Sequence, residues 1–164
     1  MTDMEALGIG LALAALLAHA AVSDLRGFRI PNYVPVLVFV LFTVVSAFVL
    51  EPRAILLHLA AGFVLFVAGA ALFAGGVWGG GDAKLVAAIG TWTGFGAMPR
   101  FLVVMALAGG VLALLMLAVR AIAPRIATAN APWHLRIART GHLPYGVAIA
   151  TGGFDWILRT GLIG

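Results

Sequence analysis

Two aspartates are the residues of this chain whose type and position best suit chemistry. Asp82 follows Gly79, Gly80 and Gly81, a glycine run bordered on both sides by long apolar sequence. Such a run permits a tight turn and a close approach of backbone, and Asp82 then falls where a helix is expected to begin. An ionisable group at or near a membrane span is costly, so we expect it to have a function and a partner. The partner that we name is Asp24.

Two neighbouring carboxylates suit the hydrolysis of a peptide bond. In a poorly solvated site they do not readily ionise together, so one keeps a proton while the other draws a proton from water. The base then activates the water and the acid protonates the carbonyl oxygen. Other site chemistry has little support, because the chain has no cysteine and His58, His134 and His142 lack the spacing of metal ligands. We therefore expect an aspartic hydrolase with no metal and no cofactor.

The composition indicates an integral membrane protein. Of the 164 residues, 63% are hydrophobic and only 10% are charged, and the mean hydropathy is +1.14. A soluble globular domain does not have this composition. The net charge of +4 arises from Lys and Arg scattered among apolar runs, which is typical of loops that set membrane orientation, so no nucleic-acid partner is expected. The length allows one domain, which we place at residues 1–164.

The apolar runs predict an all-α membrane protein with six transmembrane helices, because no alternating strand pattern recurs and a bilayer tolerates only helices or closed barrels. The first run is expected to be a retained span, since Asp3 and Glu5 precede it where a signal peptide has basic residues. Pro31 suits the first turn of the second helix. Pro99 and Arg100 are expected to separate the fourth helix from the fifth. The predicted spans are 6–22, 33–50, 54–74, 83–98, 101–119 and 144–158.

The basic residues then predict an orientation. Seven Lys and Arg fall on one side of the six-span arrangement and three on the other, which places the larger group in the cytoplasm and both termini outside. Asp24 lies in a short polar loop after the first span, and two spans separate it from Asp82. Both carboxylates are therefore expected at the cytoplasmic face. The cytoplasmic group is Arg26, Arg29, Lys84, Arg120, Arg125, Arg136 and Arg139, and the outer group is Arg53, Arg100 and Arg159.

Three motifs resemble those of the type IV prepilin peptidase family, the GxGD aspartyl membrane peptidases. Residues 24–32 read Asp-Leu-Arg-Gly-Phe-Arg-Ile-Pro-Asn and match D-x-R-x-x-x-I-P-N, residues 79–82 match G-x-G-D, and residues 144–146 match P-Y-G. The resemblance covers essentially the whole chain. It implies a bilobal peptidase of the bacterial inner membrane that removes the short basic leader of prepilins or pseudopilins at the cytoplasmic face. It also implies that Asp24 and Asp82 are the catalytic pair.

The chain departs from the larger members of that family. Those enzymes carry an extra cytoplasmic domain with paired cysteines and also N-methylate the new pilin terminus. This chain has no cysteine and begins directly with an apolar run, so methyltransferase activity is not expected. It resembles the short, peptidase-only members associated with tight-adherence (Tad, or Flp-type) pili. An archaeal preflagellin peptidase has similar motifs and stays open as an alternative.

Other residues near the motifs have expected supporting roles. Arg26 is expected to anchor the Asp24 loop or to contact lipid phosphate, and Lys84 to act on Asp82, to hold a substrate carboxylate or to reach the lipid headgroups. Tyr145 is a candidate donor to a substrate carbonyl. The arginine-rich segment 120–142 is expected to contact anionic headgroups. The supporting set is Arg26, Gly79, Gly81, Lys84, Pro144, Tyr145 and Gly146.

Several alternatives stay open at this point. Asp82 is also explained as a cap of the fourth helix, and Asp24 as an ion-pair partner of Arg26 or Lys84. A non-enzymatic transporter or assembly scaffold would use the two aspartates as a proton relay or a structural pair. A presenilin-like protease shares G-x-G-D, but Ser23 stands where that group usually has a tyrosine before its first aspartate.

Overall fold

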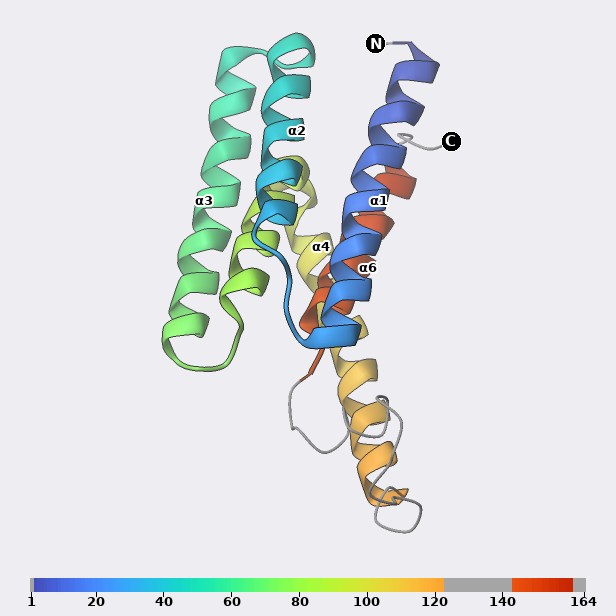
Figure 1. The fold of residues 1–164 in the computed structure, drawn as a ribbon. Helices are drawn as coiled ribbons and strands as arrows, with labels where there is room; N and C mark the ends of the chain where they lie inside the picture. Colours follow the sequence, from blue (N-terminus) through green and yellow to red (C-terminus); the bar gives the residue numbers. More distant parts are fainter. Residues whose placement is uncertain (1, 123–142, 161–164) are drawn as a thin grey trace.

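The computed structural model describes residues 2–122 and 143–160, and all regular structure within them is helical (Figure 1). The helices in chain order are α1 (Asp3–Gly27), α2 (Tyr33–Val49), α3 (Pro52–Ala74), α4 (Gly80–Ile122) and α6 (Tyr145–Arg159). The prediction of an all-α fold is confirmed for this part of the chain. The prediction that segment 120–142 contacts headgroups concerns residues that, beyond the end of α4, lie outside the described part of the chain.

Helix α4 reverses direction at Gly94. Its first part rises beside α3, and its second part descends past α6 (Figure 1). The prediction that Pro99 and Arg100 mark this break is wrong, because the non-helical residue is Gly94, with φ 56° and ψ −177°. Essentially only glycine adopts that conformation. Pro99 instead lies within the second part, five residues after Gly94, and does not end the helix.

His58 of α3 covers the break in α4. Its Nδ1 lies 2.7 Å from the carbonyl oxygen of Thr91. A Cβ atom added to Gly94 would lie only 2.8 Å from Cε1 of the His58 ring. The ring also stacks on Phe42 of α2, with 5.8 Å between the centroids. The reversal is therefore set both by the glycine backbone and by a side chain from a neighbouring helix.

The core takes buried side chains from all five helices, and α6 packs against both α1 and α4. Small residues allow these close approaches. A Cβ atom on Gly152 would lie 2.8 Å from the Phe101 ring, and one on Gly153 would lie 2.6 Å from Leu17 Cδ1. Gly62 and Gly69 of α3 both face α4, with Gly69 opposite Ala83. Backbone contact between helices thus replaces interlocked large side chains at several points.

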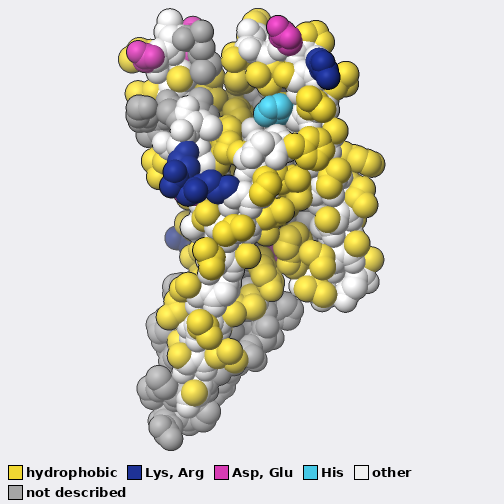
Figure 2. Space-filling view, turned by 180° about the vertical axis from the view of Figure 1, so that it is seen from behind, with side chains coloured by type: hydrophobic (Ala, Val, Ile, Leu, Met, Phe, Trp, Pro, Cys, Tyr) yellow, Lys and Arg dark blue, Asp and Glu magenta, His cyan; other side chains and the backbone are white. Residues whose placement is uncertain are grey.

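The outer surface is mostly apolar. Three helical segments are long and apolar enough to cross a membrane, namely Asp3–Gly27, Pro52–Ala74 and Gly80–Val119, and α2 is a shorter apolar helix. Hydrophobic side chains cover most of the face seen in Figure 2, and charged ones form a few small groups. Exposed apolar surface of this extent indicates an integral membrane protein, as the composition predicts. The count of six spans and the side on which the termini lie stay predictions.

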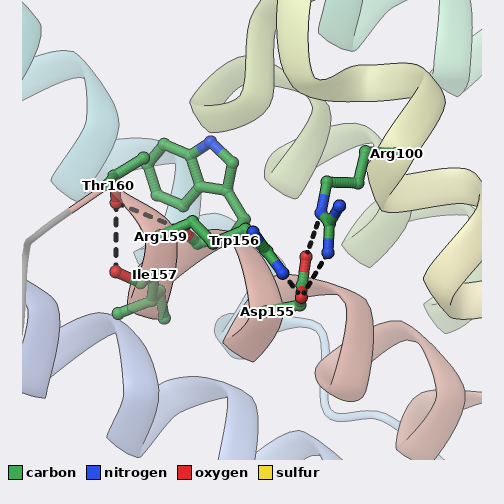
Figure 3. Close-up of polar contacts among 6 residues, drawn as sticks. All are labelled: Arg100, Asp155, Trp156, Ile157, Arg159 and Thr160. Atoms are coloured by element: carbon green, nitrogen blue, oxygen red, sulfur yellow. Dashed lines mark hydrogen bonds and ion pairs between the residues drawn. The ribbon is translucent and has the colours of Figure 1, made fainter.

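One cluster of charges ties the second part of α4 to α6 (Figure 3). Arg100 donates from Nε and Nη2 to the carboxylate of Asp155 at 2.8 and 3.1 Å, and Arg159 donates to it from Nε at 3.1 Å. The sequence assigns both arginines to the outer face, and here they lie together with Asp155. These are the ion pairs formed among the described residues.

Candidate active site

Asp24 lies in the last turn of α1, where its side chain is 5% exposed. The prediction of a loop for Asp24 and Arg26 is wrong, because α1 continues to Gly27. The helix ends at Phe28, whose left-handed backbone (φ 51°, ψ 37°) lets its N–H donate to the Asp24 carbonyl oxygen at 2.8 Å. Asp24 is therefore held by a regular helical turn next to a sharp change of chain direction.

The first turn of α6 binds the Asp24 carboxylate. The N–H of Gly146 donates to Oδ2 of Asp24 at 2.7 Å. Pro144 is the N-cap of α6 and Gly146 its second residue, so the carboxylate lies at the positive end of the helix dipole. A Cβ atom on Gly146 would lie 2.9 Å from both Cβ and Oδ2 of Asp24. Only a glycine lets this backbone approach the carboxylate so closely.

Asp82 lies in the first turn of α4 and is 9% exposed. Its Oδ2 accepts a hydrogen bond of 3.0 Å from the N–H of Gly79, the residue just before the helix. This is the reaching-back half of a capping box, with the acid at the third helical position. The interpretation of Asp82 as a cap of the helix is thus confirmed. The cap fixes the orientation of the Asp82 carboxylate and is compatible with a second role of this residue.

Both aspartates line one cavity of about 490 Å³. Asp24 approaches it from the end of α1 and Asp82 from the start of α4. The structure therefore brings together the pair that the sequence places at one membrane face. The residues that line the cavity are Ser23, Asp24, Phe28, Arg29, Ile30, Pro31, Asn32, Gly79, Gly80, Gly81 and Asp82.

Ile30 occupies the space between the two aspartate segments. A Cβ atom on Gly81 would lie 3.0 Å from Ile30 Cβ, and one on Gly146 would lie 3.0 Å from Ile30 Cδ1. Ile30 is 8% exposed. The side chain is thus a spacer between the segment that holds Asp82 and the segment that holds Asp24.

Pro31 precedes α2 instead of lying in its first turn, so that prediction is wrong. Helix α2 begins at Tyr33, and Asn32 is its N-cap. The carbonyl oxygen of Pro31 accepts a hydrogen bond of 3.0 Å from the N–H of Val34, which closes a turn just before the helix. This turn places Pro31 and Asn32 in the wall of the cavity.

The basic residues near the site do not pair with Asp24. Among the described residues, Asp155 makes both ion pairs, and the partner of Asp24 is the Gly146 amide. Lys84 donates from Nζ to Oδ1 of Asn32 at 2.9 Å, and Arg26 is exposed. The alternative that pairs Asp24 with Arg26 or Lys84 is therefore wrong, because the carboxylate accepts its hydrogen bond from the backbone N–H of Gly146.

Two contacts at the site have no signal in the sequence analysis. Trp78, just before the glycine run, packs against Tyr145 with 6.0 Å between the ring centroids. Tyr145 is half-buried in this contact. The second is the bond between Lys84 and Asn32, which are 52 residues apart. Trp78 in the loop before α4 and Lys84 in the first turns of α4 are thus each joined to a segment that is distant in the chain, so residue spacing cannot indicate these contacts.

The comparisons with known proteins assign a family. No curated protein and no solved structure matches the chain. The profile of the type IV leader peptidase family matches residues 11–114, which is more than half of the chain and includes both Asp24 and Asp82. The matched region begins in α1 and ends in α4, and so it contains the cavity described above. On this match, and in agreement with the resemblance of its motifs, the chain belongs to the type IV leader peptidase family.

Proposed function

We propose that this protein is an aspartic endopeptidase that removes the short basic leader of type IV prepilins of the Flp type, with Asp24 and Asp82 as the catalytic pair. The observation that supports this most strongly is the single cavity lined by both carboxylates. Family membership makes a protease the expected activity. In this proposal residues 1–164 form one peptidase domain.

The geometry suits the activation of water. Oδ2 of each aspartate accepts a backbone N–H, from Gly146 for Asp24 and from Gly79 for Asp82. These bonds fix how each carboxylate is turned in the cavity. In the proposed reaction one carboxylate takes a proton from the attacking water, and the other, protonated, donates to the carbonyl oxygen of the scissile bond. When the tetrahedral intermediate collapses, the carboxylate that took the proton from water passes it to the leaving amine, and one hydroxyl of the intermediate returns its proton to the other carboxylate, which restores the starting pair.

The proposed location is the cytoplasmic face of the bacterial inner membrane, in a multi-pass arrangement. Arg26 and Arg29, both exposed, lie beside the cavity at the end of α1. An excess of basic residues marks the cytoplasmic side of membrane proteins. A prepilin leader lies on that side, just before the apolar helix of the substrate, so its scissile bond would reach the cavity without crossing the membrane.

The test is cleavage of a co-expressed Flp-type prepilin, followed by gel shift and by mass spectrometry of the new N-terminus. The variants are Asp24→Asn and Asp82→Asn, which keep the size of each side chain. Asp155→Asn is the matched control, because it removes a carboxylate from α6 that lies in a different cluster. The amount of each variant in the membrane is measured alongside.

The proposal expects wild type and Asp155→Asn to remove the leader and both site variants to be inactive while still inserted. Cleavage that persists in one site variant would remove that aspartate from the mechanism. If wild type cleaves none of several prepilins, the substrate class is wrong. Equal activity of all variants would exclude the aspartic mechanism.

A further inference from the structure

A second cavity is an apolar groove of about 500 Å³ between α2, α3 and the first part of α4. Its lining residues recur three or four positions apart on each helix, as Val36 and Phe39 do on α2 and Lys84, Ala87 and Thr91 do on α4. Side chains with that spacing lie on one face of a helix. The groove therefore runs along the helix axes.

The groove meets the aspartate cavity at Lys84. This residue lines one end of the groove and follows Asp82 by two positions. Its Nζ donates to Oδ1 of Asn32, which lines the aspartate cavity. The Lys84–Asn32 bond thus spans the junction between the two cavities. A molecule that extends from one cavity into the other would lie beside this bond.

The polarity of the surface changes at the same junction. The aspartate cavity, on one side of Lys84, is lined by Asp82 and the glycine run. The groove, on the other side, is lined by Ala87, Ala88 and three aromatic side chains. From Lys84 to Thr91 the groove follows α4 for about 10 Å, given the rise of a helix. A lysine amine marks the polar end, because its stem can lie on apolar surface while its charge stays in water. The aromatic side chains are those of Phe39, Phe63 and Phe66.

We propose, on the basis of the function proposed above, that the groove binds the apolar helix of the substrate that directly follows the cleaved bond. Such a substrate is polar at the scissile bond and apolar immediately after it, which is the order found on passing from the cavity into the groove. Phe39, Phe63 and Phe66 are exposed, at 42%, 66% and 44%, and present apolar area for a helix to cover. An apolar helix seated against such a groove is a common mode of peptide recognition.

The first experiment is photocrosslinking in membrane vesicles that contain the prepilin. p-Benzoylphenylalanine replaces Phe39, Phe63 or Phe66 in the groove. The matched control is the same replacement of Phe48, which is 87% exposed on α2 and does not line the groove. The proposal expects adducts with the apolar helix of the prepilin from the groove positions and none from Phe48. Adducts with lipid alone, or equal capture at Phe48, would overturn it.

The second experiment separates the groove from the chemistry. Ala87→Leu adds bulk inside the groove, and Ala60→Leu adds the same bulk on an exposed face of α3 outside it. Two substrates are compared: the whole prepilin, and a short peptide with the same leader and cleavage site but no apolar helix. Ala87→Leu should raise the KM for the whole prepilin by about fivefold to tenfold and leave the KM for the peptide unchanged.

The control Ala60→Leu should change neither KM. Equal effects of Ala87→Leu on both substrates, or no effect on either, would count against the groove. Crosslinking does not require cleavage, so it is repeated in Asp24→Asn. Capture in the groove without cleavage by wild type would count against the proposed function alone. Cleavage by wild type without capture in the groove would count against the groove alone.

Discussion

The amide nitrogen of Gly146 lies 2.7 Å from Oδ2 of Asp24, although the two residues are 122 positions apart. The start of α6 therefore fixes the position of the first aspartate. Because α6 also packs along α1 and α4, a shift of this helix would move Asp24 relative to Asp82. The cavity thus depends on a segment that lies outside the region matched by the family profile.

Gly146→Ala is expected to reduce cleavage strongly without unfolding the protein. Its Cβ atom would lie 2.9 Å from Cβ and Oδ2 of Asp24, so the carboxylate must move. A displacement of about 1 Å at a catalytic group typically costs about 100-fold in rate. The control is Gly110→Ala, where a Cβ atom has open space. Measured kcat should fall for Gly146→Ala and stay unchanged for Gly110→Ala. Full activity of Gly146→Ala would show that the Asp24 position is not critical.

Ile30 variants should reveal its role as a spacer. Truncation of a buried isoleucine costs about 0.5–1.5 kcal/mol to valine and about 2–5 kcal/mol to alanine. Ile30→Val removes Cδ1, the atom of Ile30 that lies nearest to Gly146. This variant should therefore lower kcat with little change in melting temperature. Ile30→Ala should lower both. Thermal unfolding in detergent and single-turnover cleavage measure the two effects. A fall in stability with unchanged kcat would assign Ile30 to packing alone.

Gly94→Ala is expected to destabilise the protein through two separate causes. The backbone conformation of φ 56° and ψ −177° costs a non-glycine residue about 1–3 kcal/mol. The new methyl group also meets the His58 ring. His58→Ala should therefore recover part, but not all, of the stability lost in Gly94→Ala. Gly96→Ala, where the added atom has open space, is the control in the same melting experiment. If the double variant Gly94→Ala/His58→Ala recovered all of the lost stability, the backbone conformation at Gly94 would contribute nothing to the loss.

Single cysteines can test the proposed orientation, because the natural chain has none. Arg26→Cys is expected on the cytoplasmic side, and Thr2→Cys and Arg53→Cys on the outer side. All three positions are exposed. In intact spheroplasts a membrane-impermeant maleimide should label positions 2 and 53, and it should label position 26 only after the membrane is opened. The reverse pattern would invert the topology and would contradict a cytoplasmic cavity.

Asp155→Asn should have little effect on either stability or cleavage. The carboxylate joins Arg100 and Arg159, but the arginine side chains are 51% and 59% exposed. Exposed ion pairs contribute little, because water and salt screen them. The melting temperature in detergent should change only slightly, and less at high salt. A large fall in cleavage would instead connect this cluster to the aspartate cavity near the start of α6.

Much of this architecture follows from the sequence alone. The long apolar runs predict membrane helices, because only apolar residues can face lipid over that length, and helices are found in all the predicted regions that the structure describes. The motif around Asp24 and the one that ends at Asp82 also predict the family correctly. Local chemistry determines these features: residue type sets hydropathy, and a glycine run followed by an acid begins a helix with a cap.

Tertiary structure alone decides how the pieces meet. The sequence predicts the break in α4 at Pro99, yet it falls at Gly94, where the conformation depends on the His58 ring from α3 as well as on the glycine. One alternative pairs Asp24 with the nearby basic residues Arg26 or Lys84, whereas the carboxylate accepts a hydrogen bond from the amide of Gly146. Contacts of this kind join residues that are far apart in the chain. Because they arise from the packing of whole helices, the spacing of residues in the sequence does not indicate them.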